Sequence, residues 1–200
     1  MAEEQEFSTS MDEYLKAGLH IGTKFRNKYM MPFIYKIRSD GLSVMNVQKI
    51  DERLKFAAKM LAGYDPKDIL IVCRRENGWK SAKMFAKVTG IRVITGRYPP
   101  GIMTNSALDN FLEAKIILVV DPWPDRNVIN DAKKLGLPVI ALCDTNNESN
   151  NIDLVVPCNN KGKKSLGMIF WVLANEFQKN KGLLIADKTI SETVEGFTAE

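Results

Sequence analysis

Basic and aromatic side chains alternate in one stretch near the start of the chain, and this pattern has the clearest chemical meaning. The stretch from 15 to 39 holds six Lys and Arg residues and no acid. Its alternating cations and rings are Lys24, Phe25, Arg26, Lys28, Tyr29, Phe33, Tyr35, Lys36 and Arg38. Cations neutralise phosphates and aromatic rings stack on unpaired bases, so the composition is typical of nucleic-acid binding, without distinguishing RNA from DNA. The alternative is a solvated surface on which the apolar side chains anchor the loop to the core, as we expect for at least Phe33 and Ile34.

Two shorter motifs repeat this chemistry. The first is Arg97-Tyr98-Pro99-Pro100-Gly101, at the end of a predicted strand. The second places Lys161, Lys163 and Lys164 around Gly162 at a predicted helix start, where unpaired amides and ammonium groups can hold one phosphate. Simple helix capping explains the second motif equally well. It is not a phosphate-binding loop of the nucleotide hydrolases, because Pro157 stands where that motif requires glycine.

Three aspartates offer a competing interpretation, a nucleotide- or phosphate-binding enzyme that uses Asp121 and Asp144. Carboxylates at neighbouring strand ends can bind Mg²⁺. A structural role is favoured, because two prolines freeze the turn from 121 to 125 and Asp125 is available to cap the next helix. No GxGxxG motif follows a strand, and the single histidine, His20, has no serine or cysteine that the sequence places beside it. We therefore expect no catalytic residue, no metal and no cofactor.

Charge is divided unevenly along the chain. Residues 1–13 carry five acids and no base, residues 14–97 have a net charge of +12, and residues 98–200 have a net charge of −3, within a total of +4. Such a local excess of cations favours a polyanionic partner.

The elements that must position these residues alternate between apolar runs and amphipathic stretches. The predicted strands are Leu42–Val47, Ile69–Cys73, Ile91–Thr95, Ile116–Val120, Val139–Leu142 and Leu154–Val156. The predicted helices are Ser10–Ala17, Glu52–Leu61, Trp79–Val88, Val128–Leu135 and Lys164–Lys179, with Gly63, Gly90 and Gly136 as helix stops. This alternation predicts a three-layer, doubly wound α/β fold of the flavodoxin-like or Rossmann-like type, with a mainly parallel sheet of five to six strands. Functional loops of such sheets lie at the carboxyl ends of the strands.

The domain organisation follows from the same pattern. We expect one α/β domain over 10–181, which includes a basic extended loop over 19–40, between a mobile acidic N-terminus (1–9) and an acidic C-terminal tail (182–200). No apolar run is long enough for a membrane span, and the acidic start lacks a signal-peptide pattern. Three cysteines without a close pair predict neither disulfides nor a zinc site, which favours the cytoplasm.

Several sequence blocks, taken together, resemble the S-two family of small-subunit ribosomal proteins, in particular its archaeal members and the related eukaryotic laminin-receptor-precursor proteins. The blocks are Ala17–Thr23, Phe33–Tyr35, Asp51–Arg53, Cys73–Gly78, Gly96–Gly101, Thr104–Asn105, Asp121–Asp125, Leu142–Asn147 and Pro157–Gly162. Bacterial members carry a helical hairpin where this chain has only Gly63–Pro66, so contacts made by that hairpin are not transferred.

The resemblance implies a structural protein of the cytoplasmic ribosome, lodged between head and body of the small subunit. It would bind 16S-type ribosomal RNA and neighbouring small-subunit proteins, with no small-molecule substrate and no membrane. The residues predicted to contact RNA are Lys24, Arg26, Lys28, Tyr29, Lys36, Arg38, Arg97, Tyr98, Lys161, Lys163 and Lys164. The cations would neutralise phosphates, and Tyr29 and Tyr98 would stack on bases.

Overall fold

The centre of the molecule is a five-stranded parallel sheet. The computed structural model describes residues 8–184 and 189–198. The strands are β3 (Ile69–Cys73), β4 (Arg92–Thr95), β5 (Ile116–Val119), β6 (Val139–Cys143) and β7 (Leu154–Pro157), in the order β4-β3-β5-β6-β7. Every residue of β3, β5 and β6 is buried, as expected of continuous apolar strands that are covered on both faces.

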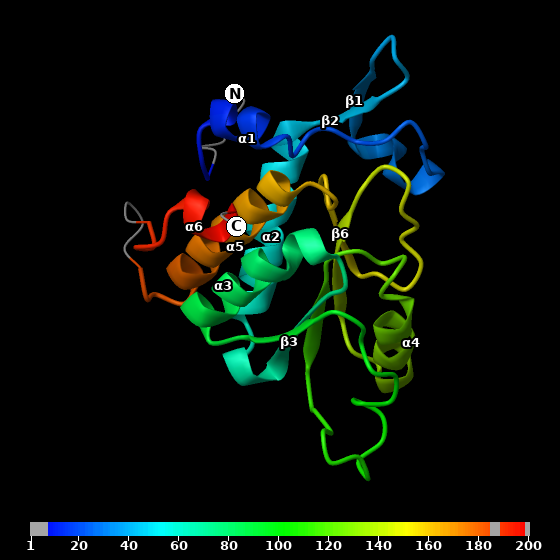
Figure 1. The fold of residues 1–200 in the computed structure, drawn as a ribbon, viewed down its shortest axis with the longest axis vertical. Helices are drawn as coiled ribbons and strands as arrows, with labels where there is room; N and C mark the ends of the chain where they lie inside the picture. Colours follow the sequence, from blue (N-terminus) through cyan, green and yellow to red (C-terminus); the bar gives the residue numbers. More distant parts are fainter. Residues whose placement is uncertain (1–7, 185–188, 199–200) are drawn as a thin grey trace.

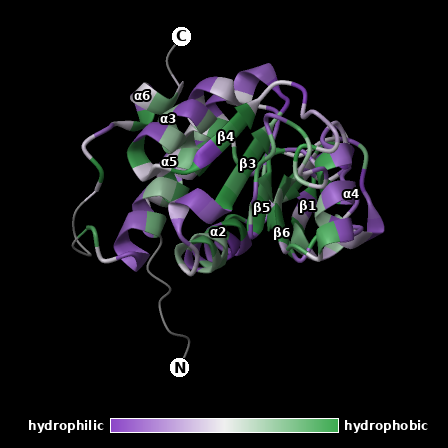
Figure 2. Ribbon diagram, turned by 90° about the horizontal axis from the view of Figure 1, so that it is seen from below, coloured by the Kyte–Doolittle hydropathy of each residue, from purple (hydrophilic) through white to green (hydrophobic). Residues whose placement is uncertain are grey.

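Helices cover both faces of this sheet. They are α1 (Met11–Ala17), α2 (Val47–Ala62), α3 (Trp79–Thr89), α4 (Arg126–Leu135), α5 (Lys163–Asn180) and α6 (Val194–Thr198). α2, α3 and α5 lie on one face and α4 lies on the other, with the apolar strands between them (Figures 1 and 2). The predicted three-layer, doubly wound fold is confirmed, and the strand order is that of flavodoxin-like proteins. Two of the predicted helix stops, Gly90 and Gly136, adopt the left-handed conformation that ends α3 and α4.

One predicted strand was assigned to the wrong sheet. Residues 42–47 were expected in the main sheet, but β2 (Ser43–Met45) pairs antiparallel with β1 (Ile34–Ile37) in a separate two-stranded sheet. The connection between them is a short turn with Gly41 at a φ of +85°, and a turn of this length can join only antiparallel strands.

The expected extended loop over 19–40 is also more ordered than predicted. It contains a 3₁₀ helix over Lys28–Phe33 and then β1. α2 begins at Val47, five residues before the predicted start, because the Asn46 side chain accepts hydrogen bonds from the first amides of the helix.

The sequence predicted a free C-terminal tail over residues 182–200, but residues 189–198 pack against the domain. Ile190 and Phe197 are buried, and the Ser81 hydroxyl donates to the Phe197 carbonyl at 2.8 Å. This segment therefore completes the core beside α3 and α5. Of the expected mobile N-terminus, residues 1–7 lie outside the described residues.

Within residues 8–184 and 189–198, no helix has both the length and the apolar composition needed to cross a membrane.

Candidate nucleic-acid interface

The strand order reverses between β3 and β5, where doubly wound proteins commonly bind ligands. Arg75 follows β3 and Asp121 follows β5, and the Arg75 Nε donates to Asp121 Oδ2 at 2.5 Å. The other oxygen of Asp121 accepts from the Asn147 side chain and from the backbone N–H of Trp123, both at 3.1 Å. Asp121 is 1% exposed, so this ion pair of the protein itself fills the position where a ligand would be expected.

A second internal ion pair lies at the ends of β6 and β7. The Lys161 Nζ lies 2.9 Å from Asp144 Oδ2 and donates to Asn146 Oδ1 at 3.0 Å. Lys161 was predicted to contact RNA, but its ammonium group is already paired with Asp144 and Asn146 of the same chain. Asn147 joins the two pairs, because its amide nitrogen donates to Asp121 and its Oδ1 accepts the backbone N–H of Asp144 at 2.7 Å. The Asn160 amide donates to the same Asn147 Oδ1 at 3.1 Å. We call this set the strand-end network; its members are Arg75, Asp121, Asp144, Asn146, Asn147, Asn160 and Lys161.

Asp125 does not cap α4 with its side chain, contrary to the prediction. Its Oδ2 accepts the backbone N–H of Arg74 at 3.2 Å instead. Burial raises the pKa of Asp125 to about 6, with a smaller contribution from the charge of Asp121.

The described residues at these strand ends do not form a nucleophilic or metal-binding site. Burial, together with the charge of Asp125, raises the pKa of the Cys73 thiol to about 12, which keeps it protonated at neutral pH. Among the residues that the structure describes, no three His, Cys, Asp or Glu side chains form a group that could hold a metal ion.

The basic stretch is pinned across the end of β6 by Thr145. The Thr145 hydroxyl accepts the backbone N–H of Thr23 and donates to the Phe25 carbonyl, both at 3.0 Å. The backbone N–H of Asn27 donates to the Thr145 carbonyl at 2.8 Å. Gly22 permits this close approach, since a Cβ there would lie 2.5 Å from Thr145 Cγ2. We call residues 22–29 the anchored loop.

Four of the predicted side chains of the anchored loop remain exposed beside these contacts. Lys24, Arg26 and Lys28 are exposed, and Tyr29 is 55% exposed. A fixed backbone thus presents three cations and a ring to solvent. The structure brings together these four of the predicted RNA-binding residues.

Two more of the predicted cations lie in the β1–β2 hairpin, where Ser43 exchanges backbone hydrogen bonds with Gly22 and Thr23 of the anchored loop. Lys36 lies in β1 and is exposed. Arg38 lies in the turn, where its Nη2 is 3.2 Å from Asp40 Oδ2, so part of its charge is neutralised locally.

Arg97 and Tyr98 follow β4, at the opposite edge of the sheet from β7. Arg97 is exposed, but Tyr98 is 2% exposed and its hydroxyl donates to Asp131 Oδ2 at 3.2 Å. The predicted stacking of Tyr98 on a base is therefore incompatible with this structure. The ring packs in the smaller core between the sheet and α4, and α4 supplies the carboxylate that satisfies its hydroxyl.

Lys163 and Lys164 are exposed on the first turn of α5. The amides just before them are engaged, because Asn159 Oδ1 accepts from the backbone N–H groups of both Lys161 and Gly162. Fewer backbone amides are therefore available to bind a phosphate than the sequence predicted. The positive charge at this helix start comes from the two lysine side chains.

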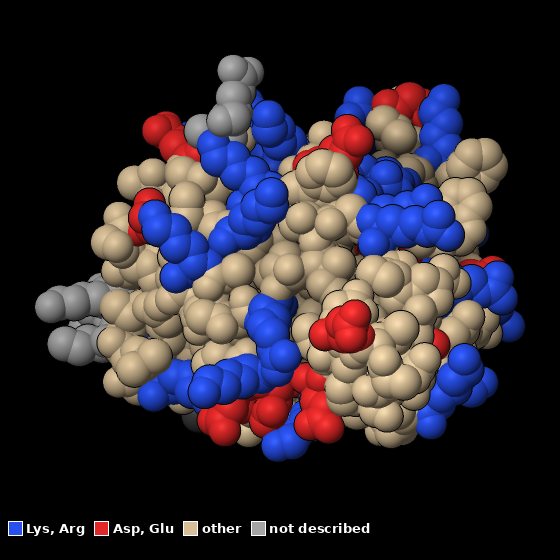
Figure 3. Space-filling model, turned by 60° about the horizontal axis from the view of Figure 1, so that its bottom comes forward, with Lys and Arg blue, Asp and Glu red and all other residues tan. Residues whose placement is uncertain are grey.

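One cationic surface was not among the predicted contacts. Lys80, Lys83 and Lys87 recur at intervals of three and four residues on α3 and line an open groove of about 500 Å³ together with Lys163. That spacing is visible in the sequence and would have identified the surface. Figure 3 shows that the cations on the face in view form several separate groups, and that the largest group of acids lies along its lower edge.

Comparison with known proteins identifies the family of this chain. The family model described as Ribosomal protein S2 matches residues 14–110 and 110–180. The chain belongs to the ribosomal protein S2 family. Its relatives include the small ribosomal subunit protein uS2 of Nanoarchaeum equitans, 46% identical over 92% of each chain. The same protein of Thermoplasma volcanium is 44% identical over 98% of this chain and 99% of that protein.

Membership of the S2 family confirms the archaeal-type resemblance and excludes the enzyme interpretation, since the family consists of structural ribosomal proteins. The chain is accordingly a structural protein of the small ribosomal subunit. The strand-end network is consistent with a structural role, because both candidate catalytic aspartates, Asp121 and Asp144, are paired with cations of the same chain.

Proposed function

We propose that this S2-family chain binds 16S-type ribosomal RNA between the head and body of the small subunit of the cytoplasmic ribosome, beside neighbouring small-subunit proteins. The principal contact is the anchored loop, where Lys24, Arg26 and Lys28 neutralise phosphates and Tyr29 stacks on a base. Additional phosphate contacts come from Lys36, Arg38, Arg97, Lys163 and Lys164.

The observation that carries this proposal is that the anchored loop combines a hydrogen-bonded backbone with exposed Lys and Arg side chains. The anchored loop is tied to Thr145 by hydrogen bonds of 2.8 to 3.0 Å, yet its three cations point into solvent. A loop that is ordered before binding loses less conformational freedom when it binds. Each phosphate it neutralises then releases a condensed counterion, which favours association at low salt.

The test is the simultaneous replacement of Lys24, Arg26 and Lys28 by Gln. We expect the slope of log affinity against log salt, measured with a 16S-type rRNA transcript, to fall in magnitude by roughly 2 to 3, because each phosphate contact contributes about 0.7 to 0.9. The fold should persist, since all three side chains are exposed.

The matched control replaces Lys133 and Lys134 by Gln. These exposed cations lie in the last turn of α4, where Lys134 Nζ is 3.5 Å from Asp131. The salt slope should stay unchanged and the free energy of unfolding should fall by well under about 1 kcal/mol. Equal loss of RNA affinity in both variants would show that binding follows net charge rather than the anchored loop.

A further inference from the structure

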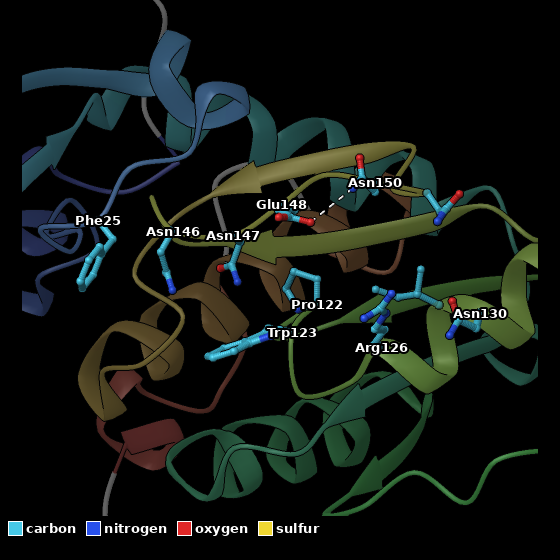
Figure 4. Close-up of a pocket in the computed structure, with 11 residues that line it drawn as sticks. Phe25, Pro122, Trp123, Arg126, Asn130, Asn146, Asn147, Glu148 and Asn150 are labelled. Carbon is cyan, nitrogen blue, oxygen red and sulfur yellow. Dashed lines mark hydrogen bonds between the residues drawn. The ribbon is translucent and has the colours of Figure 1, made fainter.

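An open groove of about 830 Å³ lies between the anchored loop, the β5–α4 turn and the loop after β6. Two aromatic rings border it, Phe25 from the anchored loop and Trp123 from the turn (Figure 4). Phe25 is 80% exposed and Trp123 is 78% exposed. Exposed rings of this size that face one groove are typical of a binding surface, because they leave a large apolar area in water.

Both rings stand on rigid backbone. The Phe25 carbonyl accepts hydrogen bonds from the hydroxyls of Thr23 at 2.9 Å and Thr145 at 3.0 Å. Trp123 lies between two prolines, and its backbone N–H is held by Asp121 Oδ1 at 3.1 Å. The backbone that carries each ring is therefore fixed before any partner arrives, and both rings remain exposed.

The rest of the groove is polar. Asn130, Asn146 and Asn150 contribute amide side chains and Arg126 contributes a cation. In Figure 4 the Asn146 amide lies between the two rings, with its nitrogen turned toward the groove. Amides in this setting match the donor and acceptor edges of an unpaired nucleobase better than an apolar peptide side chain.

Charge distinguishes an RNA partner from a protein partner. Arg126 lines the groove, and Lys24 and Arg26 flank Phe25 in the chain. One lining residue is acidic, Glu148, and it already accepts a hydrogen bond from Asn150 at 3.3 Å. This balance favours a ligand that is both aromatic and anionic.

We propose that this groove binds an unpaired nucleotide of RNA, with its base stacked on Phe25 or Trp123 and its base edge facing Asn146. This inference rests on the proposed RNA-binding function and adds a contact that recognises bases rather than phosphates. Stacking tolerates any base and depends little on salt, whereas the cations of the anchored loop act through phosphates.

The experiment compares two RNA probes, a 12-nucleotide oligoriboadenylate and an abasic 12-mer with the same phosphates. The unmodified chain should prefer the oligoadenylate. At least one of Phe25→Leu and Trp123→Leu should weaken oligoadenylate binding by roughly 5- to 150-fold, which corresponds to the loss of one stacked base, with little effect on the abasic probe. The salt slope should not change.

Matched variants separate stacking from folding. Phe56→Leu removes another half-exposed ring, on α2, and should leave both affinities unchanged. Phe25→Tyr and Trp123→Phe keep a ring and should retain most of the preference for oligoadenylate. Thermal unfolding monitored by circular dichroism checks that each variant is folded.

The outcomes are distinct. Equal affinity of the unmodified chain for both probes, or losses no greater than that of Phe56→Leu, would overturn the proposal. Unchanged RNA binding with impaired incorporation of Phe25→Leu into reconstituted small subunits would identify the groove as a protein contact and would also overturn it. If the triple Gln variant keeps its salt slope while the ring variants lose base preference, the phosphate role of the anchored loop fails and the groove assignment stands.

Discussion

The strand-end network and the anchored loop meet at the same edge of the sheet, and both depend on Arg and Lys, but they use these residues in opposite ways. Arg75 and Lys161 each face a buried carboxylate of the same chain. Lys24, Arg26 and Lys28 lie in a stretch without acids and point into solvent. The difference shows that the number of cations does not identify a phosphate-binding surface. The deciding feature is whether the protein itself supplies the anion.

The largest effect that would test this comparison is expected from Asp121→Ala. It leaves the partly buried Arg75 without its carboxylate and removes the acceptor of Asn147, so the free energy of unfolding should fall by about 2–4 kcal/mol. Urea unfolding measures this, and the salt slope of RNA binding should not change. Asp40→Ala, which breaks the exposed pair with Arg38, should cost under about 1 kcal/mol. A change in salt slope without loss of stability would contradict the division between the two regions.

Thr145→Val should affect both regions at once. Valine keeps the shape of the side chain but leaves the Thr23 amide and the Phe25 carbonyl without a side-chain partner at this position, so we expect a loss of about 1–3 kcal/mol in unfolding free energy. RNA affinity should also fall, because the loop would have to be ordered on binding. Denaturant unfolding and RNA titration of the same sample measure the two effects. Unaltered affinity would indicate that the anchoring has no bearing on RNA binding.

The pH dependence of stability should respond to Asp125→Asn. The pKa of Asp125 is about 6 in the folded chain and lies near 3.8 when unperturbed, so the folded state binds a proton more tightly between these values. Its contribution therefore favours folding below about pH 4 and is lost as pH rises through about 6. Asn keeps the acceptor for Arg74 without the charge, and should raise stability at pH 7 by about 1–2 kcal/mol. Equal unfolding curves of the two proteins from pH 4 to 7 would contradict the shifted pKa.

Tyr98→Phe should have the smallest effect. It removes the hydroxyl that donates to Asp131 while the ring stays packed, which should cost about 0.5–1.5 kcal/mol in thermal unfolding. RNA affinity should not change. A measurable loss of affinity would restore Tyr98 as a contact residue and would require the 96–104 loop to rearrange on RNA.

Sequence patterns predicted the main sheet well because its strands are apolar runs with few alternatives. They failed where the partner lies far along the chain. Nothing near Tyr98 indicates that Asp131 accepts from its hydroxyl, and nothing near Lys161 indicates the pair with Asp144. Composition reports how many cations a segment has, whereas tertiary packing decides which of them remain available to a ligand. For the same reason the basic stretch could be recognised, but its attachment to Thr145 could not.

That attachment also affects when the surface exists during synthesis. The anchored loop leaves the ribosome that makes it long before its support, since Thr23 and Thr145 are separated by 122 positions. At about 5–20 residues per second, the delay between them is about 6 to 24 s. Throughout that interval the loop lacks its contacts with Thr145, although its contacts with Ser43 can form earlier. A fully anchored loop therefore requires that β6 has been made, so RNA that selects the anchored loop discriminates against chains that end before Thr145.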